Sequence, residues 1–294
     1  MINKQDLSEK CQLNEEQIKF WDDNGYFISE SLFNEEELAD GMEHMARVFA
    51  EEYETNVPPN IRKWWAGDPD TSMKNVDNAW WSDYVIRRFV LSPAIGVIAT
   101  QLAGTDSVRL FQDQMLDKPG IGTDSPRSAT VGWHQDWAYW KCTAPAHALT
   151  ARISLDGETK ENGCMQVVRG SHHWQVQDGR HFFQDDADIN DLPDFSTPDG
   201  ETAEVAHLLL EPGGVSFHHS MTLHASSENR TESPRRTIIS HMIPGETIYQ
   251  SGTGDHAFNV SVLADQKESD LKDGDLWEGN RFPIIYPPMN SNGG

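Results

Sequence analysis

The chain has 294 residues, enough for one large domain or two small ones with a sizeable core, and 37% of them are hydrophobic. Ten Trp and twelve Phe favour a folded globule over a disordered chain. The formal net charge of −24 disfavours nucleic acid and anionic membranes as partners, because both bind basic surfaces. A solvated acidic surface is the simplest interpretation of this charge, although it would also suit a cationic substrate.

The ends and the cysteines of the chain indicate its setting. The polar N-terminus has no signal-peptide core, and no apolar run approaches the ~20 residues of a membrane helix. The three cysteines, Cys11, Cys142 and Cys164, have no CxxC spacing, so neither a disulfide framework nor a zinc knuckle is indicated. We therefore expect a cytoplasmic protein in a reducing compartment.

The first third of the chain is expected to be mainly helical. Asn14 and Asn34 each begin a capping-box pattern with flanking apolar residues, which predicts a helix start at both. Residues 24–28 (NGYFI) read as a turn into a short strand. A third helix is expected over about 80–102, ending at Gly104.

Short strands separated by turn residues dominate the rest of the chain. Apolar and polar residues alternate over 149–155, as in a half-buried strand. The turn at 162–163 (NG) before residues 164–168 predicts a hairpin. Further strands are expected at 215–217 and 237–240. This pattern indicates a sandwich or a closed jelly roll.

One domain is expected over residues 1–294, because no linker or repeat divides the chain. It would comprise helices over about 1–105 that buttress the sheet, a jelly-roll core over about 106–245, and a C-terminal extension over 246–294. Residues 175–206 form an acidic insertion, either a lid or a loose surface loop.

The most informative stretch is residues 134–137 (HQDW). In an extended strand His134 and Asp136 project from the same face. They would supply two of the three ligands of a 2-His-1-carboxylate triad, which leaves positions of an octahedral Fe(II) open for a cosubstrate and O₂.

The third ligand must come from elsewhere among twelve histidines, and His224 is favoured because a strand and a turn lead into it. Arg235 follows 11 residues later (235 − 224), and its guanidinium fork would fit the far carboxylate of a dicarboxylate cosubstrate. Arg236 is the rival, but strand alternation would put the two arginines on opposite faces.

These motifs resemble those of the phytanoyl-CoA dioxygenase family of Fe(II)/2-oxoglutarate-dependent oxygenases, over about residues 15–245. The matching segments are 112–119 (QDQMLDKP), 133–137 (WHQDW), 161–165 (ENGCM), 170–172 (GSH) and 224–226 (HAS), with Asn229 and Arg235. The resemblance implies a cupin-like double-stranded β-helix, mainly β with flanking helices.

The same resemblance implies the chemistry of the site. His134, Asp136 and His224 would ligate Fe(II), and Arg235 would hold 2-oxoglutarate with help from Ser226 and Gln112. With O₂, the enzyme would hydroxylate an unactivated C–H bond of a small-molecule metabolite and release succinate and CO₂. Related halogenases have a small residue at the position of Asp136, so the carboxylate favours hydroxylation. Desaturation and ring formation use the same ligands.

The aromatic and histidine residues around the motif have two interpretations each. Trp137 and Tyr139 would line the substrate pocket or fill the core. His218 and His219 are expected to pack or hydrogen-bond near the site, and 172–173 (HH) to shape a turn.

Two other classes of protein remain open. A cupin-type metalloenzyme could use the same donors for isomerisation or hydrolysis, which the position of Arg235 disfavours. A noncatalytic binding protein of this fold normally loses a ligand, and all three are present here. The resemblance leaves the substrate undefined, although the acidic surface disfavours a CoA thioester. The sequence predicts no oligomeric state.

Overall fold

The computed structural model describes most of the chain. The described residues are 11–59, 61–62, 72–123, 129–177, 189, 195, 197–198, 200, 202–251 and 271–287. Most of the acidic insertion at 175–206 lies outside this set, and so does the choice between a lid and a surface loop.

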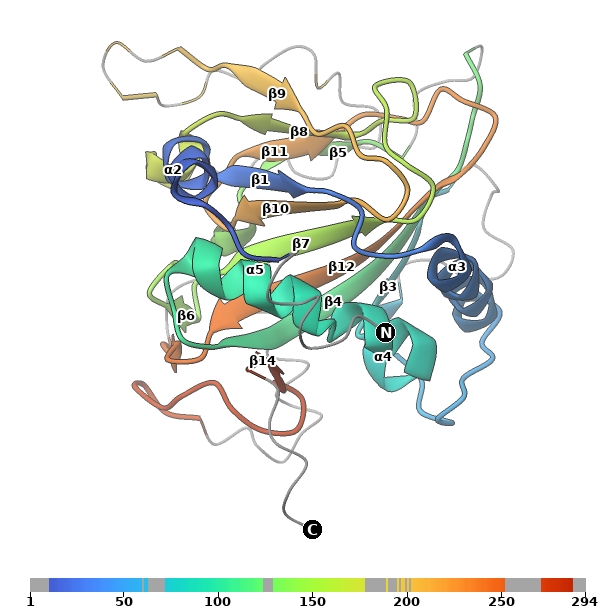
Figure 1. The fold of residues 1–294 in the computed structure, drawn as a ribbon, viewed down its shortest axis with the longest axis horizontal. Coiled ribbons are helices and arrows are strands. Elements are labelled where there is room, and N and C mark those ends of the chain that lie inside the picture. Colours follow the sequence, from blue (N-terminus) through green and yellow to red (C-terminus); the bar gives the residue numbers. More distant parts are fainter. Residues whose placement is uncertain are drawn as a thin grey trace.

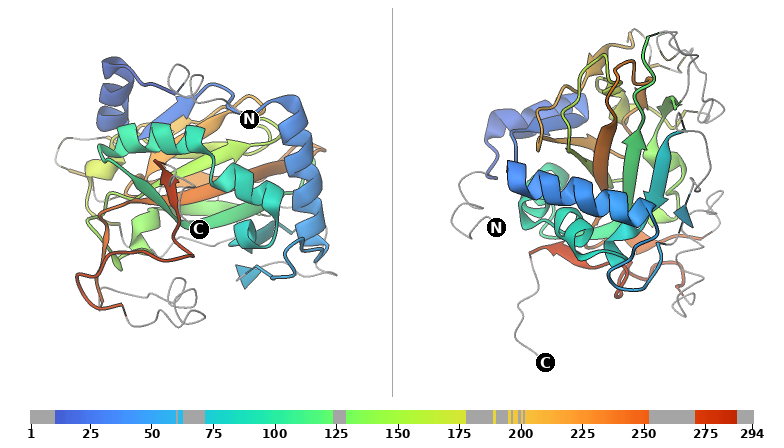
Figure 2. Two further views of the ribbon diagram at one scale, coloured as in Figure 1. Left: turned by 60° about the horizontal axis from the view of Figure 1, so that its bottom comes forward. Right: turned by 90° about the vertical axis from the view of Figure 1, so that its right-hand side faces the viewer.

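Two antiparallel sheets face each other, and helices cover the outer side of the larger one (Figures 1 and 2). The strand orders are β1-β10-β7-β12-β4-β3-β2, with β14 beside β4, and β5-β11-β8-β9. The larger sheet contains β1 (Tyr26–Ser29), β2 (Ile61–Arg62), β3 (Lys74–Asp77), β4 (Val108–Lys118), β7 (Leu149–Ser154), β10 (Val215–His219), β12 (Arg235–Pro244) and β14 (Ile284–Tyr286). The smaller contains β5 (Val131–His134), β8 (Met165–Val168), β9 (Val205–His207) and β11 (His224–Ser226), and β6 (Thr143–Ala144) pairs with β13 (Ile248–Tyr249). The predicted double-stranded β-helix with flanking helices is confirmed.

The helices are α2 (Glu15–Asn24), α3 (Glu35–Phe49), α4 (Tyr84–Val90) and α5 (Pro93–Ala103), with short 3₁₀ turns η1 (Ala79–Trp81), η2 (Asp136–Ala138) and η3 (Ser171–His173). Both predicted capping boxes are confirmed, because Asn14 and Asn34 each accept a hydrogen bond from the third helical N–H, and that residue's side chain bonds back. The turn after α2 is also confirmed, with Gly25 at φ 74°, a left-handed conformation suited to glycine.

The single helix expected over 80–102 is wrong, because the chain breaks there. Asp83 caps α4 through two backbone N–H groups, and α5 restarts with Pro93 in its first turn and ends at Gly104 (φ 62°). Residues Tyr84–Ala103 are nonetheless long and apolar enough, taken together, to pass a test for a membrane span, which the sequence analysis did not anticipate. Core helices pass the same test, and here α4 and α5 lie across the larger sheet with most of their residues buried (Figure 1).

The hairpin expected around residues 162–163 is also wrong. The turn exists, with Gly163 at φ 73°, but β7 pairs with β10 and β12 whereas β8 pairs with β9 and β11. The turn therefore carries the chain from one sheet to the other, as a jelly roll requires.

Strand β7 is buried on both faces rather than on one. Leu149, Ala151 and Ile153 face the helical layer and belong to the main hydrophobic core. Thr150 and Arg152 face the space between the sheets, where they line a cavity. The polar side of the alternation therefore points inward, toward the candidate site.

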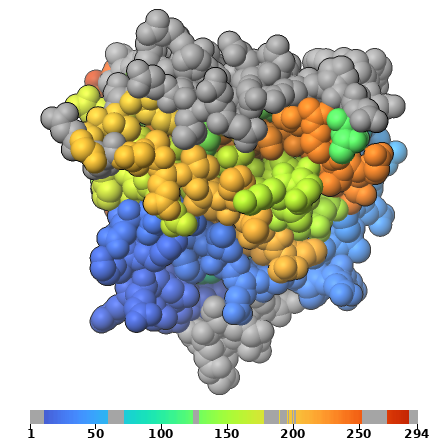
Figure 3. All heavy atoms as spheres, turned by 90° about the horizontal axis from the view of Figure 1, so that it is seen from above, coloured from blue at the N-terminus to red at the C-terminus, as the bar shows by residue number. Residues whose placement is uncertain are grey.

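The N-terminal residues (blue) lie beside the segment that leads into β9 (gold) on the face shown in Figure 3. Arg169 connects them, since it donates a hydrogen bond of 3.1 Å to Asn24 and forms an ion pair of 3.0 Å with Glu204. The N-terminal helix is thereby attached to the smaller sheet.

Candidate active site

Strand pairing brings the three predicted metal ligands together. His134 is the last residue of β5 and His224 the first of β11, and the two face each other in register. Asp136 lies just beyond the strand, in η2. Because Gln135 between them is extended, the side chains of His134 and Asp136 point to the same side of the chain. One ligand atom of each of the three residues lies within 4.8 Å of the others. The sequence analysis placed Asp136 in the same strand as His134, which is wrong because β5 ends at His134. The two side chains nevertheless lie close together, as predicted.

Both histidines are oriented as metal ligands require. Nδ1 of His134 lies 2.8 Å from the carbonyl oxygen of Gly132, and Nδ1 of His224 lies 2.9 Å from that of Thr222. Each Nδ1–H therefore donates to a backbone carbonyl, which leaves the Nε2 lone pair for a metal. Oδ1 of Asp136 lies 3.6 Å and 3.5 Å from these two Nε2 atoms. The donor set fits a divalent iron.

The second carboxylate oxygen of Asp136 is held by the protein. Oδ2 accepts hydrogen bonds from Thr150 Oγ1 at 2.9 Å and from His218 Nε2 at 3.1 Å. Thr150 in turn accepts from Nδ1 of His241 at 2.8 Å. Burial alone would raise the pKa of Asp136, but the surrounding histidines, His224 first, hold that pKa well below its usual value. Asp136 is therefore ionised, with one oxygen directed at the Nε2 atoms of His134 and His224, as a metal ligand would be.

Beyond the metal ligands lies a cavity of about 90 Å³ that contains three cationic side chains, Lys118, Arg152 and Arg235, all buried. Glu158 pairs with both arginines, at 2.8 Å to Arg235 and 3.2 Å to Arg152. Burial and the two neighbouring arginines lower the pKa of Lys118 well below its usual range. The two arginines and Lys118 face two carboxylates, Glu158 and Asp136, and a divalent metal bound to Asp136 would leave an excess of positive charge, which suits an anionic cosubstrate.

Arg235 and Ser226 lie at this cavity, whereas Arg236 does not. Arg235 donates to Ser226 Oγ at 3.3 Å, and its buried Nε has no partner within the described part of the chain. That remaining donor fits a carboxylate. Arg236 lies on the other face, in a two-point ion pair with Asp156.

A second cavity, of about 200 Å³, lies in front of the metal ligands. Its described lining is Met73, Asn75, Gln112, Gln114, Leu116, Val131, His134, Asp136, Tyr139, Trp140 and His241. Gln112 lines this cavity beside His134 and Asp136 and does not line the smaller one; its role with the cosubstrate stays a prediction. Tyr139 lines the cavity, and so does Trp140, which the sequence analysis did not assign to the pocket. Trp137 lines neither cavity and packs against a hydrophobic cluster that includes Trp140 and Trp277, in agreement with the core-filling alternative.

The expected positions of His218, near the site, and of His172 and His173, in a turn, agree with the structure, but sequence reasoning missed His241 and the inner polar residues. His218 hydrogen-bonds to Asp136, and His172 and His173 form η3, where each Nε2 donates to the carbonyl of Asp22. Lys118 and Arg152 were not singled out. Charged residues at alternate positions of apolar strands would have been the signal for them.

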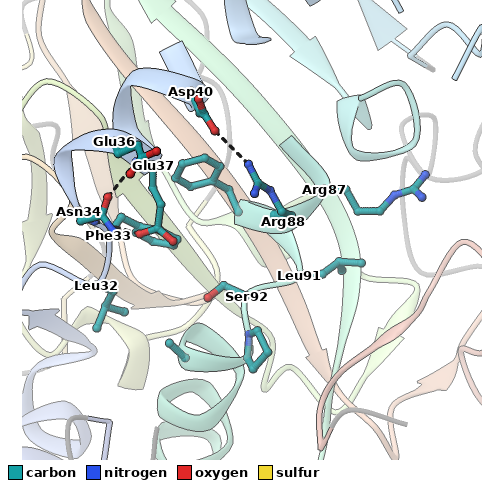
Figure 4. A pocket seen from close by; sticks show the side chains of 13 residues that line it. Leu32, Phe33, Asn34, Glu36, Glu37, Asp40, Arg87, Arg88, Leu91 and Ser92 are labelled. Carbon is teal, nitrogen blue, oxygen red and sulfur yellow. Dashed lines mark hydrogen bonds and ion pairs between the residues drawn. The ribbon is translucent and has the colours of Figure 1, made fainter. Parts of the chain in front are cut away.

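Two other features do not form comparable sites. A groove of about 590 Å³ between α3 and the α4–α5 junction is crossed by the ion pair between Arg88 and Asp40 (Figure 4), and the described residues that line it include no histidine or cysteine. His44, Glu54 and Asp83 lie close together, but both carboxylates already cap backbone N–H groups of α4.

A His-x-Asp motif and a distant histidine brought together in a jelly roll form the 2-His-1-carboxylate donor set of non-haem Fe(II) oxygenases. The sequence model of the phytanoyl-CoA dioxygenase (PhyH) family matches residues 21–237, and the chain belongs to this family. It is accordingly a 2-oxoglutarate-dependent non-haem iron dioxygenase that uses Fe(II) and O₂.

Individual relatives differ in their reactions. The chain is 28% identical over 231 residues to a probable alpha-ketoglutarate-dependent hypophosphite dioxygenase of Stutzerimonas stutzeri, covering 76% of each chain. Among solved structures, the alpha-ketoglutarate-dependent carbocyclase SnoK from nogalamycin biosynthesis is 26% identical, with a TM-score of 0.68 over 93% of this chain and 96% of that one. The epimerase SnoN, in complex with Fe³⁺ and alpha-ketoglutarate, shares the fold at 24% identity, with a TM-score of 0.69 over 92% and 98%.

Proposed function

We propose that this dioxygenase hydroxylates an unactivated C–H bond of a small-molecule metabolite, with His134, Asp136 and His224 as the iron ligands. The observation that carries the proposal is that His134 and Asp136 line two adjoining cavities of different character. The cationic cavity suits the cosubstrate, and the larger one suits the substrate. When bound, iron and 2-oxoglutarate supply O₂ activation and the oxidising equivalent, and succinate and CO₂ are released.

The protein's own residues bind and orient. Arg235 and Lys118 would hold the far carboxylate of 2-oxoglutarate, since both donate to Ser226 Oγ and so lie beside the same point of the cavity. Thr150 and His218 fix the Asp136 carboxylate. Burial of the ligand pair, with Asp136 and His224 each 7% exposed, limits the access of water to the metal.

The cupin-type alternative, an isomerase or a hydrolase, would not need the cationic cavity. Two buried arginines and Lys118 around Glu158 suit an anionic cosubstrate when a metal occupies Asp136, and this favours the oxygenase. A noncatalytic protein would not need both histidines held with Nε2 free for a metal. Asp136 occupies the ligand position that a halide would need, which favours hydroxylation over halogenation. Ring closure and epimerisation, the reactions for which the carbocyclase SnoK and the epimerase SnoN are named, are the remaining outcomes that product analysis would separate from hydroxylation.

The test is the conversion of 2-oxoglutarate to succinate by the purified protein under O₂, with and without Fe(II). We expect succinate that depends on both Fe(II) and O₂, at a low rate without substrate. Asp136→Ala should abolish it. Turnover of other compounds with Zn²⁺ or Mn²⁺ in the absence of O₂, without succinate, would favour the cupin-type alternative.

A further inference from the structure

The larger cavity carries three carboxamide side chains from two neighbouring strands. Gln112 and Gln114 alternate on β4, so both point to the same side of the sheet. Asn75 on β3 lies opposite Leu116 in the register and joins them from the adjacent strand. All three line the 200 Å³ cavity beside His134 and Asp136.

These carboxamides are not used by the fold. Within the part of the chain that the structure describes, the side chains of Gln112 and Gln114 have no hydrogen-bond partner, and Oδ1 of Asn75 is buried without one. A buried amide without a partner costs about 1–3 kcal/mol. Of the three, only Asn75 has a buried amide atom of this kind; Gln112 and Gln114 line the cavity, where a bound molecule can supply partners to their amides.

Charge is divided between the two cavities. Lys118, Arg152 and Arg235 lie only at the smaller cavity, and the described lining of the larger one holds no Lys, Arg or Glu and one carboxylate, the metal ligand Asp136. Apart from Asp136, the described lining offers no counter-ion to a substrate ammonium or carboxylate, and burying a charge without one is costly. A carboxamide offers both a donor and an acceptor without charge.

Resting on the proposed function, we infer that Asn75, Gln112 and Gln114 select a small substrate whose group beside the metal is neutral and both donates and accepts hydrogen bonds, as a carboxamide or lactam does. Tyr139 and Trp140 provide the aromatic wall of this cavity. Its volume is below the roughly 300–1,000 Å³ of pockets for drug-sized ligands. The substrate portion that enters is accordingly about the size of one ring.

The test uses three probes with one carbon skeleton: cyclohexanecarboxamide, cyclohexanecarboxylate and cyclohexylmethylamine. Each is titrated calorimetrically into the protein loaded anaerobically with Fe(II) and 2-oxoglutarate. We expect the amide to bind at least fivefold more tightly than the acid or the amine. Binding of the amide no tighter than that of either charged probe would overturn the inference.

Two substitutions at Gln112 localise the effect. Gln112→Leu, which nearly conserves volume, should weaken the amide at least fivefold, and Gln112→Glu should shift the preference to the amine. Gln166→Leu is the matched control, because Gln166 is also buried but lines neither cavity; amide binding should stay within twofold. An equal loss in the control, or no loss in Gln112→Leu, would contradict the assignment.

The affinity for 2-oxoglutarate separates this inference from the proposed function. It should stay within twofold in Gln112→Leu, because the residue lies away from the cationic cavity. A fivefold loss would return Gln112 to the cosubstrate role expected from the sequence and would overturn the inference alone. Failure of the wild-type protein to bind 2-oxoglutarate with Fe(II) would instead overturn the proposed function.

Discussion

Thr150 donates a hydrogen bond of 2.9 Å to Oδ2 of Asp136, which leaves Oδ1 as the oxygen that faces the two ligand histidines. The two residues are 14 positions apart, on a strand of the larger sheet and a 3₁₀ turn after the smaller one. The hydrogen bond therefore fixes the carboxylate across the space between the sheets.

Thr150→Val should remove this bond at nearly constant volume. Partners that orient a metal ligand typically contribute 10–100-fold to metal affinity, so we expect about a tenfold loss of Fe(II) affinity in an anaerobic chelator competition. Thr237→Val is the control, since its buried hydroxyl has no partner among the described residues. Equal Fe(II) affinity in wild type and Thr150→Val would show that the bond does not position Asp136.

Arg235→Ala should weaken 2-oxoglutarate more than iron, because a charged hydrogen bond is lost while the iron ligands remain. Such bonds contribute about 1.5–3 kcal/mol, so we expect at least about a tenfold higher Kd for 2-oxoglutarate by calorimetry. Arg236→Ala should leave this Kd within twofold, because Arg236 pairs with Asp156 on the other face. The reverse result would make Arg236 the anchor.

Lys118→Met should separate function from stability. Lys118 is fully buried beside two arginines, and burial lowers its pKa, so the cation destabilises the unliganded fold. We expect unchanged or higher resistance to urea together with weaker 2-oxoglutarate binding. A marked loss of stability with unchanged binding would assign Lys118 a structural role through its bonds to Ser226 and Ser227.

Acid should destabilise the metal-free protein through buried neutral histidines. Burial lowers the pKa of His172 to about 4 and that of His219 to about 3, whereas the unfolded values are about 6.5. The unfolded state therefore binds protons first, and stability falls as the pH drops below about 6.5.

The free energy of unfolding in urea should consequently be lower at pH 5 than at pH 7. His172→Gln with His219→Gln should flatten this dependence without removing it, because the buried His218, His224 and His241 also have lowered pKa values. A slope identical to that of the wild type would contradict the account.

Local signals in the sequence predicted local structure well. The capping boxes at Asn14 and Asn34 and the turn at Gly25 depend on a few adjacent residues, and they occur as predicted. The metal ligands were predicted to meet because the motif pattern is specific, although their assignment as ligands stays a prediction.

Features that depend on tertiary context were predicted less well. The alternation in β7 identified a strand but not the direction of its polar face. Polar side chains of a strand usually face solvent, whereas those of β7 face a polar site enclosed between the two sheets. The turn at Gly163 has the composition of a hairpin, yet strand partners across the jelly roll decide where it leads. Lys118 and Arg152 were missed for the same reason: burial of a cation is reasonable only once the cavity is known.

The most direct test of the account is anaerobic addition of Fe(II) and 2-oxoglutarate, followed by visible absorption. We predict a weak metal-to-ligand charge-transfer band in the wild-type protein, and its loss in His134→Ala and in His224→Ala, with His173→Ala as a control that retains it. Persistence of the band in either ligand variant would contradict the assignment of these imidazoles to one iron.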